Sequence, residues 1–522
     1  MQRLVLSGGA QPCRAGFPAC RFAALFSAAA LGAQKFRGLK SPLNRQARKP
    51  ALQSGRTGQR TCANKIQPHW LSRALEIICL AAILPFFVLS THAETSQKPN
   101  IIFLLTDDMG YGDVGCYGGA FVPTPNIDRL AAEGTRFTQF YCAAPICSAS
   151  RTAFLTGMYP GRWHITSYLQ TRAGNRKCEQ ADFVDPKAPS IARTLKEAGY
   201  LTGHFGKWHM GGGRDVTNAP PFHEYGFDEH AGTWESPQPD PTITATNWIW
   251  SKYDKVQRWD RSAYFVDKTL DFLRRHKGQP CYVDLWPDDV HTPWIPRGTD
   301  LDHWSQKDGA LQGNFKEVLR EYDKQVGRLL AGLKELGLEE NTILIFSSDN
   351  GPLPTFGGKR AGGLRGSKLS LYEGGDRMPL IVRWPGHVPA GRVDDKTVMH
   401  ATDFFQMFCH LAGTLPPKEA AFDGEDLTDA FFGKTLVRRH PIFWEYGRNT
   451  NSFDFPRVKR DRSPNVAMRA GKWKLLINAD RSRIELYDLE ADGNETTNLA
   501  DSQPVVAKRM AEAVLKWRKS LP

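Results

Sequence analysis

The sequence predicts an α/β protein in which buried strands alternate with helices. Two continuous apolar runs, at 101–105 and 342–346, are typical of strands that are buried on both faces of a parallel sheet. Apolar residues at helical spacing predict one helix at 191–198 and a longer one at 318–336, each followed by a glycine. Because strands and helices alternate along the chain, we expect a sheet with helices on both faces.

A second, smaller domain is expected after about residue 435, where the pattern of the sequence changes. We divide the chain into a leader over 1–93, a main domain over 94–435 and a C-terminal domain over 436–522. The last of these is predicted to be an α+β domain, an antiparallel sheet with a packed helix. Its strand-like stretches lie at 441–446, 466–477 and 485–489, and its helical pattern lies at 505–517.

The stretch 214–261 is rich in Pro, Gly and Trp, and we interpret it as a long insertion outside the core. Tryptophans in such a stretch could stack on sugar rings, but packing within the protein is the more common use of an aromatic side chain. The residues concerned are Trp234, Trp248, Trp250 and Trp259.

The net charge of +13 comes from the N-terminal leader. Residues 1–73 contain thirteen Lys or Arg and no acidic residue, which leaves 55 basic and 55 acidic residues in the rest of the chain. A body without excess positive charge has no basic footprint for DNA or RNA, so no nucleic-acid partner is expected.

The end of the leader has the pattern of a secretory signal peptide. An apolar run at 77–89 follows Arg73 and precedes small residues that end at Ala93, where we expect cleavage. The alternative is a transmembrane anchor, but thirteen residues fall short of the roughly 20 that span a bilayer. We therefore expect an exported protein without stable membrane insertion. It would be periplasmic or secreted, and lysosomal or extracellular if the source is eukaryotic.

Acidic and amide side chains follow each of the two apolar runs. Asp107 and Asp108 come after the first run, and Asp349 and Asn350 come after the second. Ligands of open α/β sheets gather beyond the carboxyl ends of the strands. Four oxygen donors at that edge would suit Ca²⁺ or Mg²⁺ better than zinc. The alternative is that these side chains only cap the loops that leave the strands.

Six cysteines follow the expected cleavage site, and they show neither a disulfide framework nor a CxxC metal motif. One or two disulfides would be compatible with an exported protein. Cys147 opens a predicted helical segment, with Arg151 four residues later. By itself, this arrangement is typical of a thiol with a lowered pKa.

The segment 147–157, CSASRTAFLTG, resembles the formylglycine signature of the type I sulfatases, in which Cys or Ser is oxidised to an aldehyde. Further motifs of that family follow in the same order and spacing over about residues 98–500, so the chain is identified as a member of the family. Within it, the chain looks most like the arylsulfatase A and N-acetylgalactosamine-6-sulfatase branch. One departure is Ala149, where the signature has Pro; the intact Arg151 and LTG tail still favour conversion. The further motifs are GYLTGHFGKWH at 199–209, HTP at 291–293, SDNG at 348–351, LRGSK at 364–368 and EGG at 373–375.

The resemblance implies an alkaline-phosphatase-like mixed sheet sandwiched by helices. It also implies hydrolysis of sulfate esters, of carbohydrates or aryl alcohols, to the alcohol and inorganic sulfate. A formylglycine-generating enzyme would convert Cys147 to formylglycine, and the hydrated aldehyde would attack sulfur. One Ca²⁺, or Mg²⁺, would be held by Asp107, Asp108, Cys147, Asp349 and Asn350.

The resemblance also implies roles for five further side chains. Arg151 would hold the hydrated aldehyde, and Lys207, His291 and Lys368 would offset the charge of the sulfate oxygens. His291 also suits protonation of the leaving alcohol. His209 is the candidate base for the later step in which sulfate leaves.

Two alternative functions share many of these features. A phosphate or phosphonate ester hydrolase of the same superfamily would share the sheet and the metal, but it would have an unmodified Thr or Ser in place of Cys147. A non-catalytic protein that binds sulfated glycans would keep Cys147 as a thiol.

Overall fold

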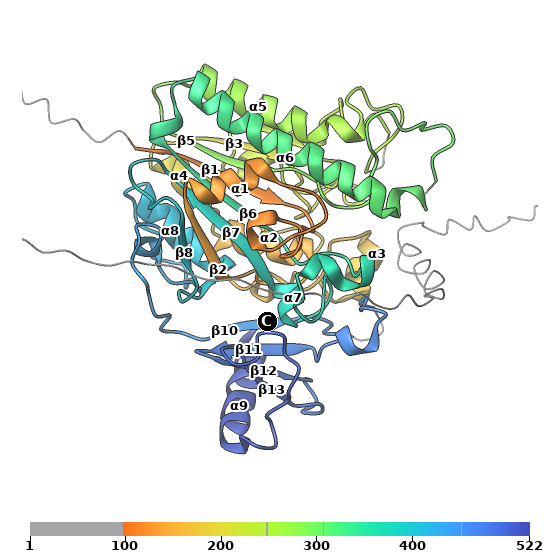
Figure 1. Ribbon diagram of the computed structural model, residues 1–522, viewed down its shortest axis with the longest axis vertical. Helices are drawn as coiled ribbons and strands as arrows, with labels where there is room; N and C mark the ends of the chain where they lie inside the picture. The colour runs from red at the N-terminus through yellow and green to blue at the C-terminus, as the bar shows by residue number, and fades with distance from the viewer. Residues whose placement is uncertain (1–97, 247–248, 306, 450–451) are drawn as a thin grey trace, which may run out of the picture. The chain divides into compact units, whose positions relative to one another are not determined.

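A mixed β-sheet lies at the centre of the part of the chain that the structure describes (Figure 1). The computed structural model describes residues 98–246, 249–305, 307–449 and 452–522, so the leader expected at 1–93 and its signal-peptide pattern lie outside the described residues. In these residues, nine strands form the main sheet in the order β4-β3-β5-β1-β6-β7-β2-β8, with β9 also paired to β2. They are β1 Asn100–Thr106, β2 Thr135–Tyr141, β3 Leu201–Gly206, β4 Glu229–Gly232, β5 Cys281–Trp286, β6 Thr342–Ser348, β7 Arg377–Arg383, β8 Arg392–Asp394 and β9 Met399–His400.

The two apolar runs of the sequence are β1 and β6, which lie next to each other in the sheet. They pair in parallel, with Thr106 opposite Ser348, so both strands end at the same edge. β1 also pairs in parallel with β5, whereas β7 is antiparallel to both β6 and β2. The expected mixed sheet is therefore confirmed.

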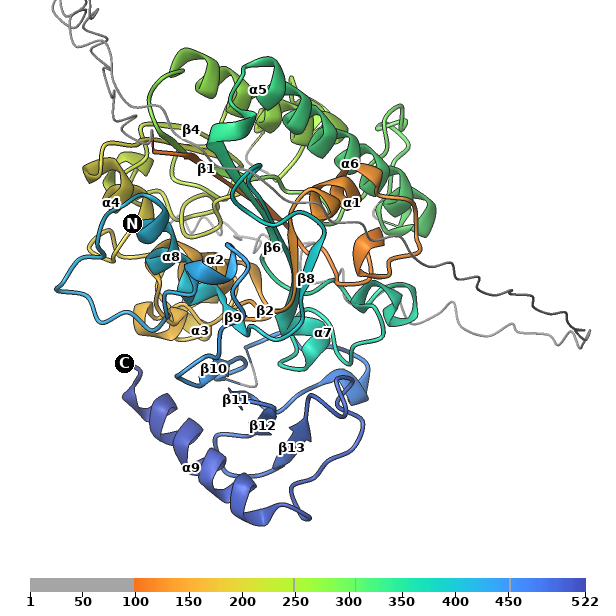
Figure 2. The ribbon, with the colours of Figure 1, turned by 60° about the vertical axis from the view of Figure 1, so that its left-hand side comes forward.

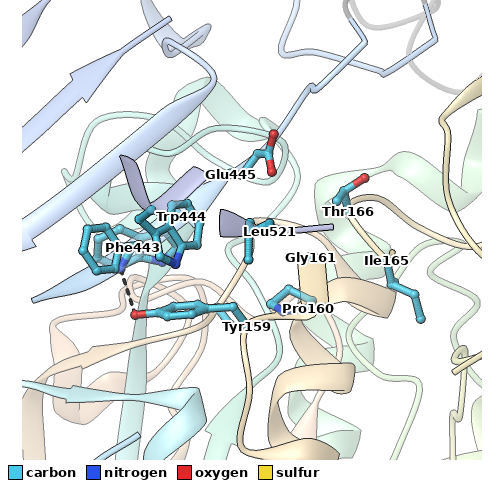
Figure 3. Close-up of a pocket in the computed structure, with 11 residues that line it drawn as sticks. Tyr159, Pro160, Gly161, Ile165, Thr166, Phe443, Trp444, Glu445 and Leu521 are labelled. Atoms are coloured by element: carbon cyan, nitrogen blue, oxygen red, sulfur yellow. Dashed lines mark hydrogen bonds between the residues drawn. The ribbon is translucent and has the colours of Figure 1, made fainter. Parts of the chain in front are cut away.

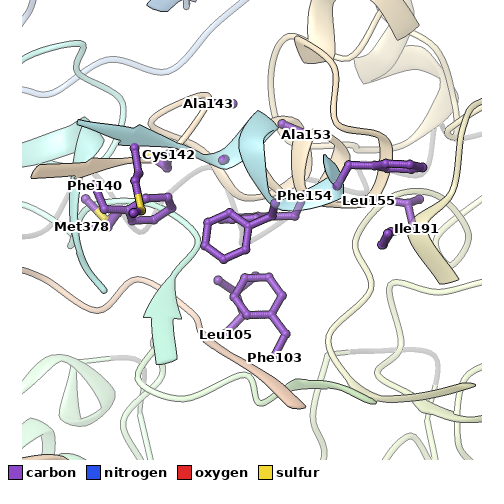
Figure 4. Packing of buried hydrophobic residues seen from close by; sticks show 14 of the residues in the cluster. Phe103, Leu105, Phe140, Cys142, Ala143, Ala153, Phe154, Leu155, Ile191 and Met378 are labelled. Carbon is purple, nitrogen blue, oxygen red and sulfur yellow. The ribbon is translucent and has the colours of Figure 1, made fainter. Parts of the chain in front are cut away.

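Helices cover both faces of this sheet (Figure 2). Alternate residues of β1 therefore enter two different cores, one on each face. Ile101, Phe103 and Leu105 pack with α2, α4 and α8, and Figure 4 shows Phe103 and Leu105 beside Phe154 of α2. The adjacent Ile102 packs with α1, α5 and α6. The helices of this part are α1 Pro125–Ala132, α2 Cys147–Thr156, α3 Arg172–Lys177, α4 Ile191–Glu197, α5 Arg261–Arg275, α6 Gln312–Glu335, α7 Glu373–Asp376 and α8 Phe404–Leu411.

The two predicted helices are confirmed as α4 and α6. α6 begins earlier than its apolar pattern indicated, because Gln312 and Gly313 in its first turn are exposed and give no periodic signal. In the described ranges of the chain, no helix is both long enough and apolar enough to cross a membrane.

The interpretation of 214–261 as an insertion outside the core is wrong for its first half. Residues Glu229–Gly232 form β4, the edge strand that pairs in parallel with β3. This strand has only four residues and no apolar run, so the sequence pattern did not reveal it. Phe222 and Trp234 are buried on either side of the strand, as expected for packing, whereas Trp248 lies outside the described residues.

The C-terminal part forms the expected antiparallel sheet with a packed helix. α9 buries Met510 and Val514 against the sheet in a core of their own. The stretch 466–477, which we predicted as one strand-like unit, forms two strands. Gly471 between them adopts a left-handed conformation, with a φ of 58°, and the chain reverses there. The elements are β10 Ile442–Glu445, β11 Val466–Ala470, β12 Trp473–Ile477, β13 Glu485–Asp488 and α9 Pro504–Ser520.

The end of α9 packs against the segment that follows α2 (Figure 3). The Phe443 N–H donates to the Tyr159 hydroxyl over 3.2 Å, and Trp517 stacks on Phe443 with ring centroids 4.9 Å apart. Leu521 lies against Gly161 beside a cavity of about 10 Å³. That volume holds at most one water molecule, so the region is a packing interface and not a ligand pocket.

Candidate active site

The carboxyl ends of β1 and β6 bring together the four oxygen-bearing side chains that the sequence singled out. The backbone N–H of Asp108 donates to Oδ1 of Asp349 over 3.2 Å, and Nδ2 of Asn350 donates to Oδ1 of Asp108 over 2.7 Å. Asp107, Asp108, Asp349 and Asn350 are all fully buried. Their proximity follows from the parallel register of the two strands, which end side by side.

Cys147 is the first residue of α2, as the sequence predicted, and its side chain faces the same carboxylates. Its Sγ lies 3.6 Å from Oδ1 of Asp107 and 4.0 Å from Oδ1 of Asp108. Burial raises the pKa of the Cys147 thiol well above its ordinary value, although Lys207 and Lys368 act to lower it. The expectation of a lowered thiol pKa is therefore wrong, because the burial of this side chain outweighs the nearby positive charge.

Arg151 follows one helical turn after Cys147 and therefore faces the same side of α2. Its Nε donates to Oδ2 of Asp349 over 2.9 Å, and its Nη1 donates to the carbonyl oxygen of Lys207 over 2.8 Å. The guanidinium lies over the Trp286 ring, 5.3 Å from the centroid. Arg151 is thus fixed by a carboxylate, a backbone carbonyl and an aromatic face.

Two lysines from distant loops complete the ion pairs. Nζ of Lys207 lies 2.6 Å from Oδ2 of Asp107, and Nζ of Lys368 lies 2.6 Å from Oδ1 of Asp108 and 3.3 Å from Sγ of Cys147. Burial acts to lower the pKa of both lysines, but the facing carboxylates outweigh it and raise each pKa. Both side chains are therefore cationic. Together with Cys147 and Asn350, these side chains form a group that we call the sheet-edge cluster; it consists of Asp107, Asp108, Cys147, Arg151, Lys207, Asp349, Asn350 and Lys368.

The two predicted catalytic histidines occupy different surroundings. Nε2 of His291 lies 3.4 Å from Oδ2 of Asp108, and the side chain is 30% exposed, which makes it the contact between the cluster and solvent. Burial lowers the pKa of His291, and Asp108 opposes that shift. His209 instead has its Nε2 hydrogen-bonded to the Leu169 carbonyl oxygen over 3.2 Å.

The donor set fits a hard cation. Ligand atoms of Asp107, Asp108, Cys147 and His291 lie within 4.8 Å of one another. Oδ1 of Asn350 is buried and has no hydrogen-bond partner among the described residues, so an amide oxygen is left free beside this group. Carboxylate and amide oxygens are the donors that Ca²⁺ and Mg²⁺ prefer. His291 was expected only as a catalytic residue, and its position in this group was not predicted.

The sequence also missed the groups that hold the histidines. Arg258 donates through Nη2 to the carbonyl oxygens of Asp288 and His291, over 2.9 and 3.1 Å. Oε2 of Glu235 lies 3.5 Å from Nε2 of His209. Arg258 and Glu235 both belong to the stretch interpreted as an insertion, where no motif or periodicity gave a signal.

The cysteines do not form the disulfides that export would have allowed. All six in the described part of the chain are free thiols, and five of them are buried. They are Cys116, Cys142, Cys147, Cys178, Cys281 and Cys409.

Comparison with protein families finds two matches that together span nearly all described residues. The sulfatase family model matches residues 99–414. A model described as the C-terminal part of N-sulphoglucosamine sulphohydrolase matches residues 367–520.

Similar proteins were also found among curated sequences and solved structures. The chain is 30% identical to N-acetylgalactosamine-6-O-sulfatase of Bacteroides thetaiotaomicron, over 81% of this chain and 93% of the relative. It is 35% identical to N-acetylgalactosamine-6-sulfatase of Canis lupus familiaris, over 68% of this chain and 70% of the relative.

Two solved structures show where the fold recurs. The crystal structure of Ps i-CgsB in complex with k-i-k-neocarrahexaose has a TM-score of 0.66 and 28% identity, over 81% of this chain and 93% of that one. The phosphonate monoester hydrolase of Agrobacterium radiobacter is 19% identical, with a TM-score of 0.57 over 81% and 96% of the two chains, and this similarity concerns the fold alone.

Proposed function

The chain belongs to the sulfatase family and is a sulfuric ester hydrolase, and from this premise we propose that it hydrolyses sulfate esters of carbohydrates with a formylglycine made from Cys147 and one bound Ca²⁺. The observation that carries the proposal is the position of Cys147. Its Sγ lies between Nζ of Lys368 and the carboxylate of Asp107, fully buried at the edge of the sheet. Relatives named for the sulfate of N-acetylgalactosamine support a sulfated sugar as substrate.

The cation would be held by Asp107, Asp108, Asp349 and Asn350, with residue 147 beside it. A bound Ca²⁺ would lower the pKa of the hydrated aldehyde and offset the charge that develops on the sulfate group. The free Oδ1 of Asn350 supports this assignment, because a buried amide oxygen without a partner costs free energy that a ligand would recover.

The remaining side chains of the site orient the sulfate group and move protons. Lys207 and Lys368 are fixed cations, positioned to bind the sulfate oxygens. Arg151, which is fixed by its hydrogen bond to Asp349, would hold the hydrated aldehyde of residue 147. His291, which is partly exposed, would donate a proton to the leaving alcohol, and His209 would accept one when sulfate is released.

Sulfate release from a panel of sulfated sugars tests the activity, with an aryl sulfate and a phosphonate ester in the same panel. The protein would be produced with and without a formylglycine-generating enzyme. We expect sulfate release only from protein whose peptide spanning 147–151 is lighter, as the exchange of sulfur for oxygen requires. Fully active protein with an unmodified thiol would contradict the mechanism and favour the phosphonate ester hydrolase. Binding of the sugars without turnover by converted protein would favour the non-catalytic alternative.

Ala149 is the residue of the signature that we expect to limit conversion. It occupies the first turn of α2, and the first backbone hydrogen bond of the helix comes from Ser150 to Ile146. Pro at position 149 would therefore remove no helical hydrogen bond. We expect Ala149→Pro to raise the converted fraction, or leave it unchanged, with a modifying enzyme of Pro preference. A lower fraction by peptide mass spectrometry would contradict this expectation.

Asp349→Ala tests the metal site. We expect it to lower both the bound Ca²⁺, measured by elemental analysis, and the turnover, because an oxygen cage loses affinity with each carboxylate removed. Asp395→Ala, at an exposed surface position, is the matched control and should change neither. Full activity with undiminished metal in Asp349→Ala would show that the assignment is wrong.

We also propose that the protein is exported, on the basis of the signal-peptide pattern that ends at Ala93. N-terminal sequencing of the mature protein should give a start near Glu94. A mature form that keeps the apolar run at 77–89 would overturn this proposal.

A further inference from the structure

We propose that Glu235 is a positioning residue for His209, and that it makes His209 the base of the sulfate-releasing step through Nδ1. The inference rests on the proposed sulfatase mechanism, in which His209 accepts a proton. It concerns a carboxylate that no motif indicated, carried by the stretch next to β4.

The surroundings of His209 fix which ring nitrogen carries the hydrogen. Nε2 lies 3.2 Å from the carbonyl oxygen of Leu169, and a carbonyl oxygen can only accept a hydrogen bond. Nε2 is therefore the protonated nitrogen, and Nδ1 keeps its lone pair. Nδ1 is buried and has no hydrogen-bond partner among the residues that the structure describes. The nitrogen that can accept a proton is thus the one that the fold leaves free.

Glu235 faces the protonated side of the same ring. Its Oε2 lies 3.5 Å from Nε2 of His209, while its Oε1 accepts a hydrogen bond from Nη2 of Arg214 over 2.5 Å. Burial acts to raise the pKa of Glu235, but the surrounding positive charge outweighs it and lowers the pKa, with Arg214 and Lys207 as the permanent cations. Glu235, held by Arg214, is therefore an anion at neutral pH.

A fixed anion at this position changes the properties of the imidazole. Burial lowers the pKa of His209 to about 3, against the opposing effect of Glu235, so the resting ring is neutral. When Nδ1 accepts a proton, the ring becomes a cation whose other N–H points toward a carboxylate and a carbonyl. This is the arrangement by which a buried acid holds the tautomer of a histidine base and stabilises its charged form.

The backbone around Glu235 is built for this close approach. The His209 N–H donates to the Glu235 carbonyl oxygen over 2.9 Å, which joins the two segments directly. Gly212 and Gly213 then have positive φ values of 94° and 69°. A Cβ on Gly212 would come within 2.3 Å of the Ser236 carbonyl carbon, so only glycine allows the two segments to meet.

The proton transfer balances within the proposed reaction. After the alcohol has left, the hydroxyl that remains on residue 147 gives its proton to Nδ1 of His209. The electrons of that O–H bond form the C=O bond of the aldehyde as the C–O bond to sulfate breaks. Inorganic sulfate leaves, and the imidazolium later returns its proton to water.

Glu235→Gln tests the inference kinetically, because it keeps the size of the side chain and removes its charge. With converted enzyme and an aryl sulfate, we expect a burst of about one alcohol per enzyme molecule, because alcohol release stays fast while sulfate release becomes the slow step. Steady-state sulfate release should then be lower by roughly 100-fold, the lower end of the range for general acid–base catalysis. Turnover should also become insensitive to the leaving group, since alcohol departure is no longer slow. Sulfate release within about twofold of the parent protein would overturn the inference.

Two further variants separate positioning from folding. Glu229→Gln, which removes the surface ion pair between this β4 residue and Arg275 of α5, is the matched control and should leave turnover unchanged. Glu235→Asp restores the charge at a shorter reach and should recover part of the turnover. If Glu235→Gln fails to fold, the same kinetic measurement is made on Glu235→Asp. The inference would be contradicted if the alcohol burst and the steady-state sulfate release of Glu235→Asp were both the same as in the parent protein.

A measurement on unconverted protein is independent of sulfatase activity. We expect NMR spectra of ¹⁵N-histidine-labelled protein, made without the modifying enzyme, to show two different nitrogens in the His209 ring. Nδ1 should have the ¹⁵N chemical shift of an unprotonated nitrogen, and Nε2 should have that of a protonated nitrogen. A His209→Gln sample assigns the signals. The opposite tautomer would overturn the inference even if the enzyme is a sulfatase. Absence of sulfate release from the converted parent protein, with the expected tautomer present, would instead count against the proposed function alone.

Discussion

The sheet-edge cluster and a second group of buried charges differ in what surrounds them, not in their chemistry. The second group, which we call the interface cluster, joins α7 to β12 and the segment after β13; it consists of Tyr141, Glu373, Lys474 and Glu495. Nζ of Lys474 lies 2.9 Å from Oε1 of Glu373 and 3.1 Å from Oε1 of Glu495, and all three side chains are 0% exposed. The Tyr141 hydroxyl donates to the other oxygen of Glu373 over 2.8 Å.

The sheet-edge cluster is equally buried, but it is open at one point and incomplete at another. His291 links it to solvent, and Oδ1 of Asn350 lacks a partner among the described residues. The interface cluster has no exposed member. Buried charge therefore does not by itself identify an active site, and the difference lies in access to solvent, which the sheet-edge cluster has through His291.

The largest expected effect comes from Cys147→Ala. If the sheet-edge cluster is the reaction centre, this change should lower the turnover rate by about a thousand-fold or more, while folding and Ca²⁺ binding persist. Sulfate release, thermal unfolding and metal content are the measurements. Cys142→Ala is the matched control, since Cys142 is another fully buried thiol and its Sγ contacts the backbone carbonyl oxygens of Ala144 and Gly375. Equal loss of activity in both variants would remove the distinction between a reactive and a structural thiol.

Lys474→Met should have the next largest effect, on stability. It leaves Glu373 and Glu495 buried without their shared cation, and breaking a buried ion pair in this way costs about 3–5 kcal/mol. Lys472→Met, two residues earlier, removes a partly exposed pair with Asp488 and should change the stability little, because solvent screens that pair. Denaturant unfolding measures both. Equal effects of the two variants would contradict the view that the interface cluster contributes through its burial.

Glu495→Gln should have the smallest effect, visible only as a change in pH dependence. Burial and the charge of Glu373 raise the pKa of Glu495 from 4.5 to about 7, although Lys474 opposes the shift. The folded protein thus keeps a proton that the unfolded chain releases near pH 4.5, so the free energy of unfolding falls as the pH rises to about 7. Glu495→Gln should remove this part of the decline.

Unfolding free energies at pH 5 and pH 7.5 give the measurement for Glu495→Gln. The control is Glu490→Gln at an exposed position, which should keep the full decline. A decline of the same size in Glu495→Gln and in the parent protein would show that Glu495 titrates normally.

The sequence predicted the sheet-edge cluster because its members follow local patterns. Asp107 and Asp349 come at the ends of apolar runs, and parallel strands bring such ends together. Cys147 and Arg151 lie one helical turn apart, and a family signature marks them. The edges of the fold were harder to predict, since β4 is too short to have a periodic pattern.

The interface cluster and the Glu235–His209 pair could not be predicted in the same way. Glu373, Lys474 and Glu495 lie on three separate segments, and their contact depends on how the C-terminal sheet packs against α7. Glu235 meets His209 only because of the glycines between them and the path of the following loop. Such contacts are set by tertiary packing, for which a single sequence has no periodic or local signal.

The complete burial of α2 has a consequence for the biogenesis of the protein. Every residue of this helix is buried, so an enzyme that reads 147–157 as an extended peptide cannot reach it once the helix has docked. In the proposed mechanism, conversion of Cys147 and folding would therefore compete for the same segment, and chains that fold first would be excluded from conversion. The yield of active molecules would then depend on the relative rates of conversion and folding, and not on the stability of the finished fold.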